Sequence, residues 1–232
     1  MTTSPALTCC VFAWNEVATL ESVVREIHGV VSAMGVPFEV LLIDDGSTDG
    51  SRELGDRLAG ELEHVRAVPH VDNQGLGAVY RTGFEQARGA FVTFFPGDGQ
   101  FPATIISQFH PHTARHDLVL GYLPRRTDLM GLALSATERV LYGVLFGKMP
   151  RFQGIFMAKT SSLRALQLRS SGRGWAIVME MILRAQRGRW PTISLPTAYR
   201  PRSHGVSKVN NLRSVSNNFK QLVQLRRLIN DD

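Results

Sequence analysis

Short apolar runs alternate with longer segments in which apolar and polar positions recur at helical spacing. The apolar runs predict buried strands at residues 7–14, 38–46, 64–70 and 90–97. The segments between them predict helices at residues 15–35, 47–62 and 75–89, the second of them with Ser47 or Thr48 as its N-cap residue. This alternation predicts an α/β fold with a doubly wound, mostly parallel sheet flanked by helices.

A single domain is expected over residues 1–210, followed by a short C-terminal tail, residues 211–232. The chain of 232 residues is 44% hydrophobic, which is enough to bury a substantial core. The tail places apolar residues beside basic ones: Phe219, Leu222, Val223 and Leu225 beside Lys220, Arg226 and Arg227. The tail is therefore predicted to be an amphipathic helix, which either binds a surface or packs against the domain.

The longest apolar run, residues 129–147, approaches the length of a membrane span. Because Glu138 and Arg139 lie near its middle and central charges are costly in lipid, we expect a helix that is buried or lies at an interface. The N-terminus lacks the basic region and apolar run of a secretory signal. Cys9 and Cys10 are adjacent in an apolar strand, as is typical of small core residues rather than a disulfide. We therefore expect a cytoplasmic protein.

The net charge of +6 conceals an uneven distribution along the chain. Residues 1–147 carry 10 Lys and Arg against 17 Asp and Glu, whereas residues 148–232 carry 16 against 3. Such a split favours contact between the C-terminal third and an anion, such as a phosphate group or an anionic membrane surface. A solvated basic face is the simpler alternative. The sequence has no aromatic-rich basic motif of the RNA-binding kind, so we expect no nucleic-acid partner.

Two carboxylates, Asp44 and Asp45, follow the second predicted strand. At the carboxyl end of a buried strand, an acidic residue can accept hydrogen bonds from a nucleotide base or ribose. N-capping and turn formation explain part of the polar run that follows. Gly75 and Gly77 open a predicted helix and can approach a phosphate, although close packing of helix on strand explains them equally well. A P-loop would require Gly-Lys-Ser or Gly-Lys-Thr, which the sequence lacks.

A single carboxylate, Asp98, lies in the turn after the fourth predicted strand. The sequence of residues 91–101 is FVTFFPGDGQF, in which a buried strand breaks into a glycine-rich turn. Open α/β folds bind their ligands outside the carboxyl ends of such strands. Asp98 is therefore a candidate for ligand contact.

Several stretches, in order and with ordinary spacing, resemble those of GT-A-fold family 2 glycosyltransferases. They are VFAWNE, LLIDDGSTDGS, NQGLGAVYRTGFEQARGAFVTFFPGDGQFP, GWAIVMEMILRAQRGRWPTISLP and RSHGVSK, and together they extend over residues 7–210. Within that family the sequence is most similar to the dolichol- and polyprenyl-phosphate mannose synthases. The resemblance implies a GT-A fold and an inverting transfer of a sugar from a nucleotide diphosphate donor, such as GDP-mannose or a UDP-sugar, to a polyprenyl phosphate.

The resemblance also implies roles for particular residues. Those implied to contact the donor nucleotide are Phe12, Trp14, Glu16, Asp44 and Asp45. Asp98 matches the second Asp of an Asp-x-Asp motif, which implies a catalytic residue and metal ligand, and its neighbours Gly97 and Gln100 are implied to contact the donor. Arg202 and Lys208 match the basic pair of R-x-x-G-x-S-K, which closes over the donor phosphates. Two cations placed there would stabilise the negative charge that develops on a leaving diphosphate.

Three positions depart from the family pattern. Pro96 replaces the first Asp of Asp-x-Asp, and Leu123 stands where an Arg is usual. Arg151 stands where an Asp is usual, and we expect it to contact the donor. The change of Phe12 from the usual Pro is milder. Losing one carboxylate and gaining one cation makes the site more positive by about two charges.

These departures bear on the expected cofactor. Mg²⁺ or Mn²⁺ needs only one or two carboxylates when substrate phosphates supply further ligands. We therefore expect Asp98 to hold such an ion weakly and only together with the donor. Alternatively, arginines neutralise the diphosphate directly, namely Arg151 or the pair Arg125 and Arg126.

The expected function is thus that of an active glycosyltransferase, with a lipid phosphate as acceptor and with peripheral contact at the cytoplasmic membrane face as one option. Polyprenyl-phosphate synthases often carry C-terminal membrane helices that this chain does not have, so a soluble small-molecule acceptor stays open. A catalytically lapsed protein that binds a nucleotide sugar or a partner is a second alternative. A membrane or scaffold role without a nucleotide is the third.

Overall fold

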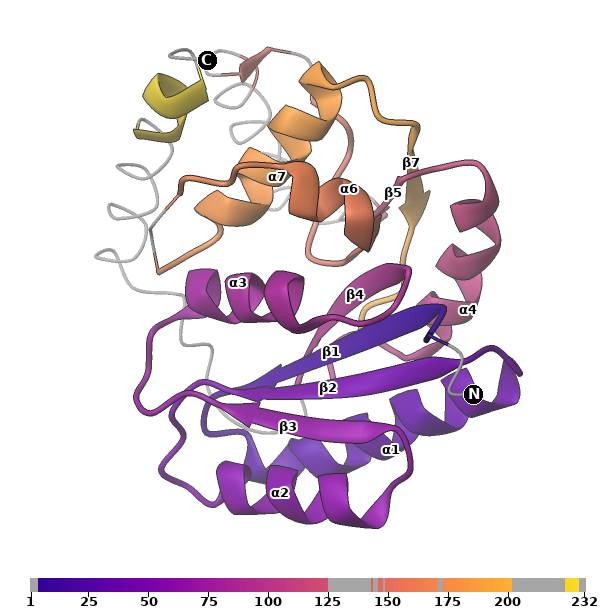
Figure 1. The fold of residues 1–232 in the computed structure, drawn as a ribbon, viewed down its shortest axis with the longest axis vertical. Coiled ribbons are helices and arrows are strands. Elements are labelled where there is room, and N and C mark those ends of the chain that lie inside the picture. The colour runs from indigo at the N-terminus through magenta and orange to yellow at the C-terminus, as the bar shows by residue number, and fades with distance from the viewer. Residues whose placement is uncertain are drawn as a thin grey trace.

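A seven-stranded sheet forms the centre of the molecule (Figure 1). The computed structural model describes residues 4–124, 143, 146–147, 149–170, 173–201 and 224–229. The strands are β1 (Leu7–Ala13), β2 (Phe38–Asp44), β3 (Val65–Pro69), β4 (Phe91–Pro96), β5 (Leu118–Tyr122), β6 (Phe156–Lys159) and β7 (Thr192–Pro196). Their order in space is β3-β2-β1-β4-β6-β5-β7. The predicted fold class, a mostly parallel and doubly wound sheet, is confirmed.

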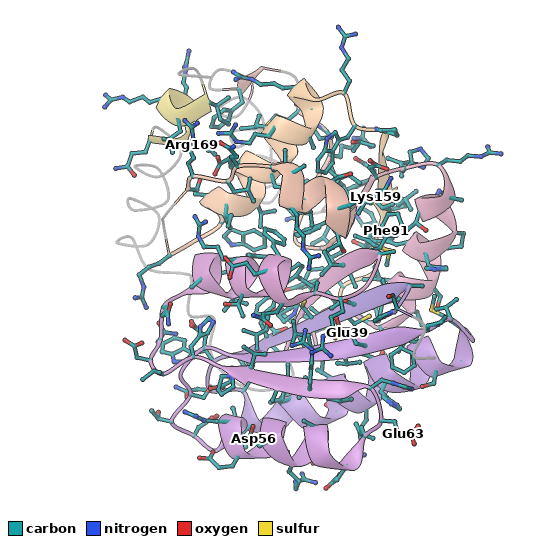
Figure 2. The ribbon with its side chains drawn as sticks, in the orientation of Figure 1. Glu39, Asp56, Glu63, Phe91, Lys159 and Arg169 are labelled. Atoms are coloured by element: carbon teal, nitrogen blue, oxygen red, sulfur yellow. The ribbon has the colours of Figure 1, made fainter. Side chains whose placement is uncertain are left out.

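Strand β6 is the exception to the parallel arrangement. It runs antiparallel to both of its neighbours, β4 and β5, whereas the other neighbouring pairs are parallel. In the register, Lys159 at the end of β6 pairs with Phe91 at the start of β4, and Figure 2 shows the two side by side. The chain therefore enters β6 at the edge of the sheet where β4 ends.

Helices cover both faces of the sheet. They are α1 (Val17–Ala33), α2 (Ser51–Glu61), α3 (Leu76–Gln86), α4 (Thr104–Phe109), α6 (Thr160–Ala165) and α7 (Ala176–Arg187), with a 3₁₀ turn at His110–Ala114. Buried residues of α1, α2 and α4 share one hydrophobic cluster, and those of α3, α6 and α7 share another on the opposite face. Figure 1 shows α1 and α2 below the sheet and α3 above it. Strands such as β1, β2 and β5 thus bury alternate side chains in the two clusters.

Helix α2 begins later than the sequence predicts. Its first residue is Ser51 and its N-cap position is Gly50, with φ of 97°, so the expected cap at Ser47 or Thr48 is wrong. The side chain of Ser47 instead accepts a hydrogen bond from the backbone of Asn15, at 2.8 Å. This polar run therefore joins two loops rather than starting a helix.

The C-terminal residues that the structure describes, 224–229, are helical. Leu225 and Ile229 are buried against Met179 and Leu183 of α7. This part of the tail therefore packs against the domain, which was one of the two alternatives. The structure does not describe Phe219, Lys220, Leu222 and Val223, nor most of the apolar run at 129–147. Within the described ranges, no helix has the length and apolar character needed to cross a membrane.

Candidate active site

Most of the predicted site residues that the structure describes lie where three neighbouring parallel strands end. In the register, Ala13 of β1 pairs with Asp44 of β2, and Phe12 pairs with Pro96 of β4. The loops that follow these strands therefore start side by side. In open α/β sheets, a crevice outside the carboxyl ends of the strands is the usual place for a ligand.

Asp44 ends β2 and has a buried side chain, with 9% of the residue exposed. Its Oδ2 accepts a hydrogen bond from the backbone N–H of Ser47, at 3.0 Å. Its Oδ1 is buried and has no hydrogen-bond partner among the residues that the structure describes. A buried polar atom left unpaired costs about 1–3 kcal/mol. An incoming N–H or O–H donor would remove that cost.

Asp45 has a different environment, although it is the next residue. Its Oδ1 is 2.7 Å from His70 Nδ1 and accepts the backbone N–H of Gln74 at 3.0 Å. Its Oδ2 accepts Asn73 Nδ2 and the backbone N–H of Gly75, both at 2.8 Å. These contacts make Asp45 the anchor of the loop between β3 and α3. Its contact with a donor stays a prediction.

The β1–α1 loop is tied to the β2–α2 loop by reciprocal hydrogen bonds. Asn15, which has φ of 55°, receives Thr48 N–H on its Oδ1 at 2.9 Å and donates its own N–H to Ser47. The backbone N–H of Glu16 donates to Ser51 Oγ at 2.9 Å. The two loops therefore form one connected wall beside Asp44.

Two aromatic residues belong to this wall. Trp14 is 41% exposed, one of the few large apolar side chains exposed among the described residues. Phe12 is half-buried, with its ring centroid 6.0 Å from that of Tyr80. Trp14 thus offers apolar surface to solvent, and Phe12 packs against the core.

Asp98 lies in a turn that packs against the start of α1. Gly97 N–H donates to the carbonyl of Phe12 at 2.8 Å, and Thr19 Oγ1 donates to the carbonyl of Gly97 at 2.6 Å. Asp98 is 6% exposed, and its Oδ1 accepts the backbone N–H of Gln100 at 3.1 Å. These contacts place one carboxylate beside the loop that carries Trp14 and Glu16.

The segment after β7 also reaches this turn, although sequence reasoning assigned it no role. Arg200 N–H donates to the carbonyl of Gln100 at 2.8 Å, and Gln100 Nε2 donates to the hydroxyl of Tyr199. The only signal in the sequence is position, since these residues lie directly before the R-x-x-G-x-S-K motif. Arg202 and Lys208, like Arg125 and Arg126, lie outside the described residues.

Arg151 lies on the segment that leads into β6. It is exposed, and its guanidinium carbon is 5.3 Å from the centroid of the Tyr122 ring at the end of β5. A cation over an aromatic face is held by electrostatic attraction. Arg151 is thus on the β5–β6 side, whereas Phe12, Trp14, Glu16, Asp44, Gly97, Asp98 and Gln100 follow β1, β2 and β4.

The described residues contain no group of three or more His, Cys, Asp or Glu that could by itself hold a metal ion. A divalent hard cation prefers six or more oxygen ligands. Asp98 fits such an ion only as one ligand among others that a substrate would supply. Its buried carboxylate, next to a glycine turn, is compatible with that arrangement.

Known proteins are similar to this chain along most of its length. Residues 8–157 match the family model described as Glycosyl transferase family 2. A dolichol-phosphate mannosyltransferase of Saccharomyces cerevisiae is 24% identical over 197 residues, which are 80% of this chain and 74% of that protein. An undecaprenyl-phosphate 4-deoxy-4-formamido-L-arabinose transferase of Pseudomonas paraeruginosa is 28% identical over 213 residues, 86% of this chain but only 59% of that protein.

Solved structures support the same fold. The mannosyltransferase PcManGT from Pyrobaculum calidifontis, in complex with GDP-Man and Mn²⁺, has a TM-score of 0.68 at 19% identity, covering 100% of this chain and 66% of that chain. At this identity the likeness concerns the fold alone. Together with the sheet order described above, it confirms the expected GT-A fold.

Proposed function

The chain belongs to glycosyl transferase family 2, and we propose that it transfers a sugar, with inversion, from a nucleoside diphosphate donor to the phosphate of a polyprenyl lipid. The proposed donor is GDP-mannose or a UDP-sugar. The acceptor class follows from the names of the yeast and Pseudomonas relatives, both of which refer to lipid phosphates. Peripheral contact with a membrane is part of the proposal, because such an acceptor is anchored in lipid.

The unpaired oxygen of Asp44 is the observation that carries the proposal. A base N–H or a ribose hydroxyl in the crevice would donate to Oδ1 and satisfy it. Trp14 would supply an apolar face for the nucleoside, with Phe12 and Glu16 completing that side. Asp45 would hold the neighbouring β3–α3 loop through its contacts with His70, Asn73 and Gly75, and its own contact with the donor stays a prediction.

The diphosphate would lie at the Asp98 turn. When bound there, Mg²⁺ or Mn²⁺ would neutralise phosphate charge, with Asp98 as its protein ligand and the turn residues Gly97 and Gln100 in contact with the donor. Arg151, together with Arg202 and Lys208 of the R-x-x-G-x-S-K motif, would add positive charge. Charge on a leaving diphosphate grows in the transition state, so cations placed in advance lower the barrier.

An ionised phosphate acceptor needs no strong general base, whereas a hydroxyl acceptor does. In this proposal Asp98 is assigned to the metal, which leaves this carboxylate unavailable as a general base. This arrangement favours a lipid phosphate over a sugar or alcohol hydroxyl. A soluble acceptor that itself carries a phosphate fits the same chemistry.

A thermal-shift panel tests donor binding. We expect stabilisation by GDP- or UDP-sugars that increases when Mn²⁺ or Mg²⁺ is added. Purified protein is then incubated with the stabilising donor and with either polyprenyl phosphate or a soluble phosphorylated acceptor. Transfer to the lipid supports the proposal. Transfer only to the soluble molecule would show that the acceptor is a soluble phosphorylated compound and not a lipid phosphate. Binding without transfer or donor hydrolysis indicates a lapsed enzyme, and no binding of any nucleotide sugar contradicts the proposal.

A further inference from the structure

A short segment after β7 is attached to the Asp98 turn, and we call this segment, residues 197–201, the strap. At its start, Thr197 N–H donates to the carbonyl of Tyr122 at 2.9 Å, so the strap is fixed to the end of β5. Further along, the ring of Tyr199 packs edge-on against Phe101, with centroids 5.4 Å apart. The strap thus joins the end of β5 to the residue that directly follows the turn.

An ion pair holds the far end of the strap. The guanidinium of Arg200 donates to both carboxylate oxygens of Glu26 on α1, at 2.8 and 3.0 Å. Glu26 Oε1 also accepts the backbone N–H of Ala103, at 3.1 Å, just before α4. Hydrogen bonding to Glu26 raises the pKa of Arg200. One carboxylate therefore connects α1, the start of α4 and the strap.

Gln100 links this ion pair to Asp98. Its carbonyl accepts the N–H of Arg200, and its own N–H donates to Asp98 Oδ1. The direction in which the Asp98 carboxylate points thus depends on where Gln100 lies, and the strap sets that position from the opposite side. Gly99, with φ of 73°, is the flexible residue between them.

From these contacts we infer that Arg200 and Glu26 are positioning residues for the donor site. They hold the strap on Gln100 and so fix the Asp98 carboxylate for a metal–diphosphate complex. The inference rests on the proposed function for the identity of that complex. Neither residue contacts the reacting atoms in this role; each acts through Gln100.

The alternative is that the pair merely adds surface stability. The side chains of Arg200 and Glu26 are 49% and 33% exposed, and exposed pairs contribute little to the free energy of unfolding. Arg57 provides a matched control, since it is 48% exposed and pairs with Glu21 on the same helix α1 without touching the turn. A functional effect of Arg200 that Arg57 lacks would therefore not come from the loss of a surface charge.

The first experiment uses the ligand-free protein. Amide hydrogen exchange at residues 97–101 is compared in wild type, Arg200→Ala, Glu26→Gln and Arg57→Ala. We expect faster exchange at these residues in the first two variants and no change in the third, with melting temperatures within about 2 °C of wild type. Unchanged exchange in both Arg200→Ala and Glu26→Gln would overturn the inference, whatever nucleotide the protein binds.

The second experiment measures Mn²⁺ binding in the presence of GDP or UDP. The half-saturating Mn²⁺ concentration should rise roughly 5- to 10-fold in Arg200→Ala and Glu26→Gln, and the double variant should show no further rise. Affinity for the bare nucleoside should stay unchanged, because the strap acts at the phosphate end. Equal Mn²⁺ affinity in all variants would overturn the inference. If wild type binds neither nucleotide, the proposed function fails, while the exchange experiment still decides whether the strap holds the turn.

Discussion

His70 Nδ1 lies 2.7 Å from Asp45 Oδ1 in a buried pair that joins the end of β3 to the end of β2. On its other side, His70 Nε2 is 2.8 Å from Thr82 Oγ1 on α3. Asp45 also receives the backbone N–H groups of Gln74 and Gly75. The pair is therefore the centre of a network that fixes the β3–α3 loop against the sheet.

Replacing Asp45 with Ala should lower the free energy of unfolding by roughly 2–4 kcal/mol, because buried donors lose their acceptor. Urea denaturation would measure the change, with Asp72→Ala, an exposed neighbour in the same loop, as the control. A stability equal to that of the control would show that the network contributes little.

Asp44 should behave in the opposite way. Asp44→Ala loses a single hydrogen bond to Ser47 and removes an oxygen that is already unpaired, so stability should change by about 1 kcal/mol or less. Nucleotide affinity should fall by roughly 30-fold, since the charge-assisted hydrogen bond from base or ribose to Oδ1 would be lost. Calorimetry on the folded variant tests this, with Glu63→Ala, which Figure 2 shows far from the strand ends, as the control. Unchanged affinity would remove Asp44 from the site.

The contrast between these adjacent residues shows how far sequence reasoning extends. Local runs of apolar residues indicate where a strand ends, so the positions of Asp44 and Asp98 at or just after strand ends were predictable from the sequence. Asp44 and Asp45 look alike in sequence, yet Asp44 accepts a local hydrogen bond from Ser47, whereas the partners of Asp45 lie about thirty positions away, such as Gly75. The pair of Glu26 and Arg200 spans 174 positions and gives no local signal.

Metal binding is expected to depend on the nucleotide. Without it, wild type should bind Mn²⁺ only weakly, because Asp98 supplies one carboxylate. Asp98→Asn should abolish transfer, and Pro96→Asp should tighten Mn²⁺ binding roughly tenfold by adding a second carboxylate. Titration with and without nucleotide measures both effects, and Pro96→Asn controls for the loss of the proline ring. Tight Mn²⁺ binding by the wild type without nucleotide would show that further protein ligands hold the metal. Full transfer in the presence of a chelator would show that arginines, and not a metal, neutralise the diphosphate.

Lys208 is expected to act on the transition state. Lys208→Ala should lower kcat by roughly 100-fold while leaving nucleoside affinity unchanged, because the charge it faces grows as the sugar leaves. Steady-state kinetics and calorimetry separate the two quantities. Parallel losses in turnover and in nucleoside binding would instead point to a structural role.

Acid should destabilise the protein through Glu180. This carboxylate is fully buried and accepts Ser170 N–H at 2.7 Å and Arg184 Nε at 2.8 Å. Burial alone would raise its pKa, but the hydrogen bonds from Arg169, Ser170 and Arg184 outweigh burial and lower the pKa below its usual value of 4.5. A group whose folded pKa is lowered stabilises the fold above its unfolded pKa, and that contribution is lost as pH falls through the folded value.

Glu180→Gln should therefore be less stable than wild type at pH 7 by roughly 2 kcal/mol, with the difference shrinking below pH 4.5. Denaturation curves at a series of pH values provide the measurement, and Glu63→Gln, an exposed acid, provides the reference. A gap between Glu180→Gln and wild type that stays constant from pH 7 to pH 3 would rule out the linkage.

The reversed direction of β6 bears on how this fold can change its specificity. Strands β1, β2 and β3 each end in a loop that must also start a helix, as Asn15 and Glu16 do before α1. An antiparallel strand instead begins there, so the segment with Arg151 has no helix to start; Gln153 N–H donates to Gly121 O at 2.7 Å, and the ring of Phe152 packs against that of Trp175. Substitutions in this segment can change the charge near the strand ends without disturbing the start of a helix. Sequence divergence among proteins with this fold is thus least constrained beside the antiparallel strand.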